Sequence, residues 1–301
     1  MTFDIVALGE PLYELNQQPD GRYLAGFGGD TSNAVIAAAR LGAKTAYVSR
    51  LGADLFGDAL MDLWRSEGVD TSAVIRDAEV PTGLYFVTHS DRGHDFTYRR
   101  KGSAASLMTP EALPERLIAA AKFLHVSGIS QAISETAAAT VARAIAIARE
   151  AGSRISFDTN FRPRLWPAEM ARPVIMAAAA RTDILKTSVE DCAALLGISD
   201  PASIAKHFLA LGSVSVLVTL GRDGVLAATA SGMDIVPGRE VAAVDATGAG
   251  DAFTGALLCE LARGQALAAA IRFANTAAAL STQGYGAIAA LPRRADVEGL
   301  I

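Results

Sequence analysis

The sequence predicts an α/β protein built on a doubly wound, mostly parallel sheet flanked by helices. Short apolar runs alternate with helical stretches along most of the chain, which is typical of strand–helix–strand units. The chain has 301 residues, a length that suits two domains or one large α/β domain with an attachment. Hydrophobic residues make up 51% and charged residues 20% of it, which excludes an intrinsically disordered chain.

The expected elements follow one another in a regular order. Asp30 or Thr31 is the expected N-cap of the first helix, and Gly42 and Gly68 are the expected stops of the first two helices. The strands are expected at 5–9, 45–49, 123–127, 154–158, 183–186 and 215–220, and the helices at 31–41, 56–67, 134–151, 168–180, 189–196 and 201–211.

Two segments, 12–27 and 83–101, interrupt this alternation because they are strand-like without intervening helices. The second is typical of a hairpin, with a polar turn around Asp91, Arg92 and Gly93. We expect the two segments to pair into a small β-sheet lid over one edge of the core. An irregular surface excursion is the alternative. The core itself would comprise 1–11, 28–82 and 102–301.

Charge and cysteine content narrow the function classes. With 27 basic and 32 acidic residues the formal charge is −5, which argues against a nucleic-acid partner. Cys192 and Cys259 form no CxxC pair, so no disulfide scaffold or zinc site is expected. The N-terminus lacks the basic segment of a signal peptide, and the apolar run 175–180 is too short for a membrane helix. We expect a soluble cytoplasmic protein with no membrane partner.

The segment 244–256, VDATGAGDAFTGA, carries the clearest chemistry. Its small residues precede a helical pattern, and the first turn of a helix has free N–H groups and a partial positive charge. Together these features predict a site for a phosphoryl group. Asp251 lies at the start of the helix, where its carboxylate could accept the proton of an attacking hydroxyl. The alternative is an ordinary tight turn whose Asp251 only stabilises the helix.

Residues 245–255, DATGAGDAFTG, resemble the second signature of the ribokinase (PfkB) sugar-kinase family. Residues 28–42, GGDTSNAVIAAARLG, resemble its first signature. The resemblance covers nearly the whole chain, and it implies a ribokinase-like fold with the active site in the cleft between core and lid. Further segments that resemble the family, in its order, are 51–57, 158–162, 218–224 and 272–278.

The resemblance implies ATP-dependent phosphoryl transfer with Mg²⁺. It does not decide whether the enzyme also requires a monovalent cation. Asp251 would be the base. The family usually has Asn-x-x-Glu where this chain has Ser188 to Asp191, so Asp191 would reach the metal through water. The residues around the phosphoryl group would be Gly248, Ala249 and Gly250, and those bordering the nucleotide would be Ser188, Thr219, Gly221, Gly224, Ala246 and Asn275.

Segments 81–85 and 98–106 resemble one branch of that family, the 2-keto-3-deoxygluconate kinases, which phosphorylate the C6 hydroxyl of this sugar acid. Phe96, Tyr98 and Arg100 share one face of the second excursion, where a guanidinium can bind a carboxylate. The residues implied to bind the sugar hydroxyls are Gly28, Gly29, Asp30 and Asn33, and those implied at the acid end are Tyr85, Tyr98, Arg100 and Arg162.

Several alternatives stay open from the sequence. The 2-ketogluconate kinases share the Arg-Arg…Gly-Ser-Ala-Ala-Ser stretch, and a kinase for fructose or ribose would use the same phosphate loop. The basic strand at 96–101 could instead be a solvated edge. A dinucleotide oxidoreductase would need GxGxxG after the first strand and a P-loop enzyme GxxxxGK[ST], and the sequence has neither. An exposed lid sheet also predicts a homodimer formed through the lid.

Overall fold

Parallel strands run through the centre of the molecule. The computed structural model describes residues 2–90 and 93–301. Within these residues nine strands form one sheet in the order β13-β12-β11-β10-β9-β8-β1-β4-β5, parallel except for the β11–β12 and β12–β13 pairs. The strands are β1 (Ile5–Leu8), β4 (Thr45–Gly52), β5 (Val74–Asp77), β8 (Phe123–Ser127), β9 (Arg154–Asp158), β10 (Ile184–Ser188), β11 (Ser215–Thr219), β12 (Gly224–Thr229) and β13 (Gly232–Pro237).

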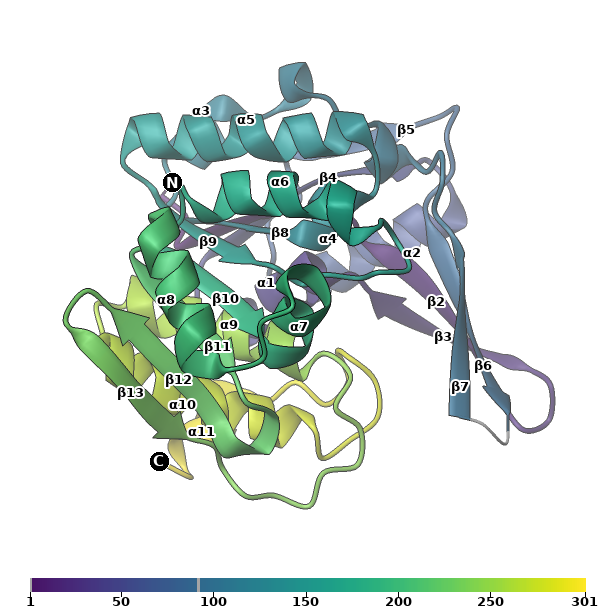
Figure 1. Cartoon of the computed structure of the whole chain (residues 1–301). Helices are drawn as coiled ribbons and strands as arrows, with labels where there is room; N and C mark the ends of the chain where they lie inside the picture. The colour runs from purple at the N-terminus through teal and green to yellow at the C-terminus, as the bar shows by residue number, and fades with distance from the viewer. Residues whose placement is uncertain (1, 91–92) are drawn as a thin grey trace.

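Helices cover both faces of this sheet (Figure 1). Strand side chains alternate between the faces, so Val6 and Leu124 join one apolar core with α5, α6 and α8, whereas Ile5 and Phe123 join another with α9 and α10. The helices are α1 (Asp30–Arg40), α2 (Leu55–Ser66), α3 (Glu115–Ala119), α4 (Gly128–Ala132), α5 (Glu135–Ala151), α6 (Ala168–Ala179), α7 (Val189–Leu196), α8 (Pro201–Leu211), α9 (Ala249–Ala262), α10 (Leu267–Ser281) and α11 (Arg294–Glu298).

The predicted alternation of strands and helices is confirmed, but the predicted cap of the first helix is wrong. Gly29 caps α1 with φ +113, and Asp30 is already helical, its carboxylate accepting the N–H of Thr31. A side chain at position 29 would lie 2.4 Å from a backbone carbonyl oxygen, so only glycine fits there. Gly42 and Gly68 adopt positive φ after α1 and α2, as expected for helix stops.

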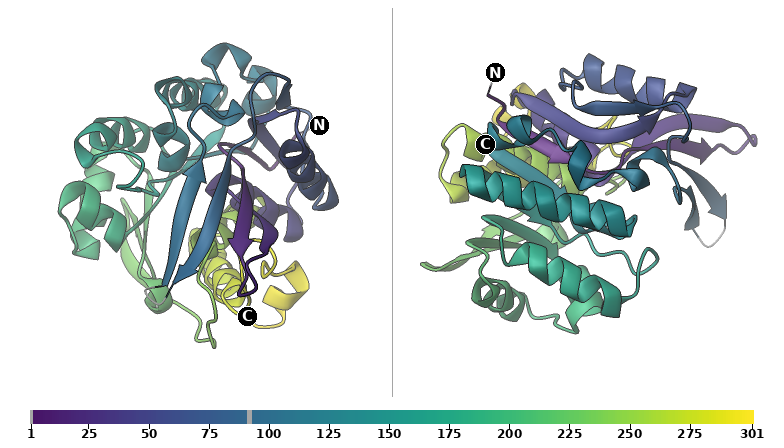
Figure 2. Two further views of the ribbon diagram at one scale, coloured as in Figure 1. Left: turned by 90° about the vertical axis from the view of Figure 1, so that its right-hand side faces the viewer. Right: turned by 90° about the horizontal axis from the view of Figure 1, so that it is seen from above.

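The two interrupting segments pair into a second, small sheet, as predicted. Its order is β3-β2-β6-β7, with β2 parallel to β6 and antiparallel pairing at both edges. Figures 1 and 2 show this sheet projecting at one side of the core. The turn expected at Asp91 and Arg92 lies outside the described residues. The strands are β2 (Leu12–Gln17), β3 (Tyr23–Gly28), β6 (Leu84–Ser90) and β7 (Gly93–Arg99).

The parallel strands β8, β9 and β10 end at the same edge of the main sheet. In doubly wound sheets ligands bind outside these carboxyl ends, so the polar residues that follow the strands are the first to consider. None of the helices in the described part of the chain could span a bilayer.

Candidate active site

The loop before α9 leaves the first backbone N–H groups of that helix without a capping side chain in the described structure. Gly248 precedes α9 with φ +77, and a side chain there would come within 2.9 Å of Ala287. Asp245 fixes the loop, because its carboxylate accepts the backbone N–H groups of Thr247 and Gly286 at 2.9 Å each. Within the described residues no side chain caps α9, whereas side chains cap α2, α5, α7 and α8. The N-terminus of α9 can therefore receive an anion.

Close packing joins α1 and α9 near their N-terminal ends. A side chain at Gly255 would lie 2.3 Å from the carbonyl oxygen of Ala34, so glycine lets the two helices touch. At this contact the Nδ2 of Asn33 donates to Oδ2 of Asp251 at 2.8 Å. The other amide atom, Oδ1 of Asn33, is buried and has no partner in the described part of the chain. The structure thus brings the predicted base and a predicted sugar-binding residue into direct contact.

Asp251 has the electrostatics of a general base. Burial in the site raises the pKa of its carboxyl to about 7, and the negative charge of Asp30 adds to the rise. The hydrogen bond from Asn33 and the positive charge of Lys186 lower the same pKa. A carboxyl that titrates near neutral pH is suited to accept a proton from a substrate hydroxyl.

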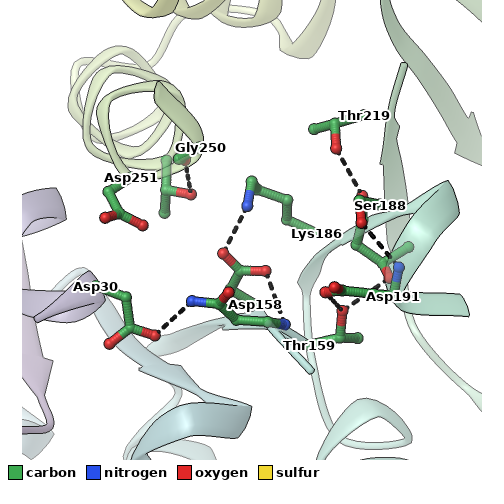
Figure 3. A network of polar contacts seen from close by, with 12 residues as sticks. Asp30, Asp158, Thr159, Lys186, Ser188, Asp191, Thr219, Gly250 and Asp251 are labelled. Atoms are coloured by element: carbon green, nitrogen blue, oxygen red, sulfur yellow. Dashed lines mark hydrogen bonds and ion pairs between the residues drawn. The ribbon is translucent and has the colours of Figure 1, made fainter. Parts of the chain in front are cut away.

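A buried lysine, which the sequence reasoning missed, lies among these acids (Figure 3). The Nζ of Lys186 lies 2.5 Å from Oδ2 of Asp158 at the end of β9. Burial opposes the charged ammonium, but the carboxylates of Asp158, Asp251 and Asp191 outweigh it and raise the pKa of Lys186. Its signal in the sequence was a single cation inside the apolar strand ILKTS.

Asp30 is held by a strained loop. Its Oδ2 accepts the Nδ2 of Asn160 at 2.8 Å. Asn160 has φ +34 and is the single non-glycine residue with positive φ in the described chain. Such backbone strain clusters at functional sites. Asn160 lies in the 158–162 segment that resembles the family, although the sequence analysis assigned it no role.

The predicted metal contact is occupied by protein donors. Asp191 lies in the first turn of α7, which Ser188 caps by accepting the Asp191 N–H at 3.0 Å. Its carboxylate accepts the hydroxyl of Thr159 at 3.1 Å and the N–H of Phe161 at 3.0 Å, as Figure 3 shows in part. Thr219 pairs with Ser188 across β10 and β11. The described residues hold no cluster of three or more side chains suited to a metal ion.

The other residues expected at the nucleotide lie in turns or contact the backbone near β12, β13 and α9. A side chain at Gly224 would lie 2.2 Å from the carbonyl oxygen of Val236, and Asn275 donates to that oxygen at 3.1 Å. Gly221 has φ +61 in the turn before β12, and Ala246 is exposed before α9. Of these residues Asn275 lines a cavity of about 540 Å³, whose lining is Pro237, Gly238, Arg239, Glu240, Arg272, Asn275, Thr276, Leu300 and Ile301.

Two tyrosines of the small sheet stack on one face. Tyr85 and Tyr98 pair across β6 and β7 with ring centroids 5.6 Å apart. The Tyr85 hydroxyl donates to the carboxylate of Glu14, a residue that the sequence analysis did not consider. A side chain at Gly28 would lie 2.7 Å from that hydroxyl, so glycine lets Tyr85 approach the start of α1. The small sheet thereby reaches the Gly28–Gly29 pair.

Arg100 is not the open guanidinium that strand alternation predicted. It forms an ion pair with Glu10, which is 1% exposed. Burial raises the pKa of Glu10, and the neighbouring Arg100 charge opposes the rise. The Nε of Arg100 is buried without a partner in the described chain, so the guanidinium is neutralised but not fully hydrogen-bonded.

Arg162 stands in a different environment from Arg100. Its side chain is 52% exposed, and Nη1 lies 3.5 Å from a carboxylate oxygen of Asp191. Nη1 also donates to the Phe161 carbonyl at 3.1 Å. The two arginines therefore face different protein carboxylates, and they share no hydrogen-bond partner in the described structure.

Comparison with known proteins identifies the family. The family described as pfkB family carbohydrate kinase matches residues 3–294. A 2-dehydro-3-deoxygluconokinase of Thermoproteus tenax is 35% identical, with 99% of this chain and 94% of that protein covered. A fructokinase of Vibrio alginolyticus is 34% identical, with 96% of each covered.

A solved E. coli protein assigned as ribokinase II, in complex with ATP and Mg²⁺, superposes with a TM-score of 0.89 at 27% identity. That superposition covers 98% of this chain and 97% of the other. The expected ribokinase-like fold is confirmed. The chain belongs to the pfkB family of carbohydrate kinases, which transfer a phosphoryl group from ATP to a sugar hydroxyl.

Proposed function

We propose that the protein phosphorylates the C6 hydroxyl of 2-keto-3-deoxygluconate to give 2-keto-3-deoxy-6-phosphogluconate. The observation that carries the sugar-acid proposal is the buried Nε–H of Arg100, which lacks a partner in the described chain. An unpaired buried donor is unfavourable, and an acidic substrate oxygen would satisfy it. The 35% identity to a 2-dehydro-3-deoxygluconokinase supports the same substrate.

In this proposal the remaining polar groups orient the sugar. Asp30 and Asn33 would bind its hydroxyls beside Gly28 and Gly29. Tyr85 and Tyr98 would contact the sugar from the small sheet, which would act as a lid. The half-exposed Arg162 would bind the acid end as the lid closes.

Asp251 would take the proton as the C6 oxygen attacks the γ-phosphorus. The new bond joins that oxygen to phosphorus, the bond to the bridging oxygen breaks, and ADP leaves. Asn33 holds the receiving carboxylate. The amides of Ala249 and Gly250 at the open start of α9, beyond Gly248, would stabilise the charge on the phosphoryl group.

The acids in the described part of the chain do not form a closed metal site, so Mg²⁺ would enter with the nucleotide. Bound there, it would neutralise phosphate charge. Asp191 would contact it only through water, because Thr159 and Phe161 already donate to its carboxylate. Ser188, Thr219, Gly221, Gly224, Ala246 and Asn275 would border the nucleotide.

Fructose is a second candidate for a specific reason. Glu10 neutralises Arg100, and Glu14 places a further carboxylate beside Tyr85. Both features reduce the positive charge that a sugar acid would meet. The fructokinase at 34% identity is consistent with this reading.

An ADP-release assay with Mg-ATP tests the proposal. The substrates are 2-keto-3-deoxygluconate, 2-ketogluconate, fructose and ribose. The highest kcat/KM with the deoxy keto acid is the expected result. A preference for 2-ketogluconate would retain the sugar-acid pocket but change the assigned acid, and activity on a neutral sugar alone would refute the role of Arg100 and Arg162.

We also propose a homodimer formed through the small sheet. This sheet exposes Tyr23, Leu24, Phe96 and Tyr98 by 36% to 62%. Leu24→Glu should shift the mass measured by light scattering from dimer to monomer. Met170→Glu is the control, because Met170 is 60% exposed on α6, which packs on the main sheet. A monomeric wild type would refute the dimer.

A further inference from the structure

Lys186 is a cation in a place where the kinase reaction needs one. It belongs to β10 and is 9% exposed, yet it reaches the edge of the sheet where the strands end. Figure 3 shows its side chain between Asp158 on one side and the start of α9, with Gly250 and Asp251, on the other.

The distance to α9 is set by glycine. A Cβ added at Gly250 would lie 3.3 Å from Nζ of Lys186 and 3.7 Å from its Cε. The ammonium therefore lies against the same turn whose backbone amides no side chain caps. A positive side chain and free N–H groups converge on one point, which is the arrangement that stabilises a transferring phosphoryl group.

The ammonium is charged and has donors to spare. An ammonium carries three N–H groups, and Asp158 is the hydrogen-bond partner that the described structure gives it. Two donors thus remain. The carboxylates of Asp158, Asp251 and Asp191 hold it in its charged form.

We propose that Lys186 is a further catalytic residue, whose ammonium contacts the transferring phosphoryl group at the start of α9 while Asp158 positions it. Lys186 forms no covalent bond in this step. It stabilises charge on the phosphoryl oxygens as the proton of the sugar hydroxyl passes to Asp251. The inference rests on the kinase activity and is independent of which sugar is phosphorylated.

A merely structural lysine would neutralise Asp158 and do nothing more. A double variant distinguishes the catalytic role from the structural one. Lys186→Met leaves Asp158 buried without its partner, whereas Lys186→Met combined with Asp158→Asn removes both charges. Lys186→Arg retains the charge but moves its position.

The first test measures kcat and KM for these variants and for Asp158→Asn, with the sugar that wild type phosphorylates best. We expect kcat to fall about 10²–10³-fold in both Lys186→Met and the double variant, with KM for ATP changed much less. Lys186→Arg should recover part of the loss. If the double variant regains the kcat of Asp158→Asn, Lys186 only balances charge and the proposal is overturned.

The second test needs no sugar, so it separates this inference from the assignment of the substrate. Calorimetry measures MgADP binding with and without aluminium fluoride, which mimics a transferring phosphoryl group. We expect fluoride to tighten MgADP binding at least about tenfold in wild type and not in the double variant, with MgADP alone unaffected. Equal tightening in both proteins would overturn the proposal even where all four sugars fail as substrates.

Discussion

Asn33 donates its side-chain N–H to the Asp251 carboxylate at 2.8 Å, and this bond ties the first turn of α1 to the first turn of α9. The two residues are 218 positions apart in the chain. One lies in the segment expected to bind the sugar and the other in the segment expected to bind phosphate. Their contact places proton acceptance where a sugar hydroxyl and a phosphoryl group would meet.

Asp251→Asn should reduce kcat about 10²–10⁴-fold, because the amide cannot accept the hydroxyl proton. Folding should be unaffected or improved at pH 8, since an ionised carboxylate with a raised pKa is unfavourable in the folded state. Steady-state kinetics and thermal unfolding at pH 8 check both points. Wild-type turnover in this variant would remove Asp251 from the mechanism.

The pH dependence of kcat/KM should report the Asp251 carboxyl. Activity should rise with pH through about 7, because the base must be ionised. Asn33→Ala should move this limb to higher pH, since the lost hydrogen bond had lowered the pKa of Asp251. Thr182→Ala is the control, because its buried hydroxyl donates to the backbone carbonyl of Ala179 before the start of β10. A limb that moves to lower pH in Asn33→Ala would contradict the assignment.

Gly248→Ala should cost more stability than Gly152→Ala. Both glycines have the same left-handed backbone, with φ +77 and +78. A Cβ at Gly152 meets no atom within 4 Å, whereas one at Gly248 lies 2.9 Å from Ala287. We expect about 1 kcal/mol for Gly152→Ala from backbone strain alone, and at least about 1 kcal/mol more for Gly248→Ala. Urea unfolding measures the loss of stability in both variants. Equal losses would mean that the loop around Ala287 shifts to make room for the added Cβ.

Alternating apolar runs predicted the central strands because strands such as β8 and β9 are buried on both faces. The edge strands β5 and β13, and β12 beside β13, were not predicted. The half-buried Arg76 in β5 and the exposed Asp234 in β13 dilute the apolar pattern of these two edge strands. The local sequence does not indicate that these segments pair with a neighbouring strand of the sheet.

The candidate site was predictable where it rests on contiguous sequence, and the phosphate loop with Asp251 is such a segment. Lys186 and Glu10 were missed because their roles depend on partners distant in the chain. Strand alternation placed Arg100 on the same face as Tyr98. It could not indicate that a buried Glu10, 90 residues away, already pairs with the guanidinium.

The Arg100–Glu10 pair makes a prediction about stability that depends on pH. Arg100→Met leaves the Glu10 carboxylate buried and unpaired, which should cost about 3–5 kcal/mol at pH 7.5. Burial raises the pKa of Glu10, so protonation at lower pH should relieve the penalty. The loss should therefore be smaller at pH 5.5 than at pH 7.5, as measured by urea unfolding.

The matched control is Arg100→Met combined with Glu10→Gln, which removes both charges and should recover most of the stability at pH 7.5. Glu10→Gln alone tests the link to substrate, because it leaves the Arg100 charge unopposed near the small sheet. Its kcat/KM ratio for 2-keto-3-deoxygluconate over fructose should rise above the wild-type ratio. An unchanged ratio, together with a pH-independent loss in Arg100→Met, would mean that the pair is structural and that Arg100 does not contact the substrate.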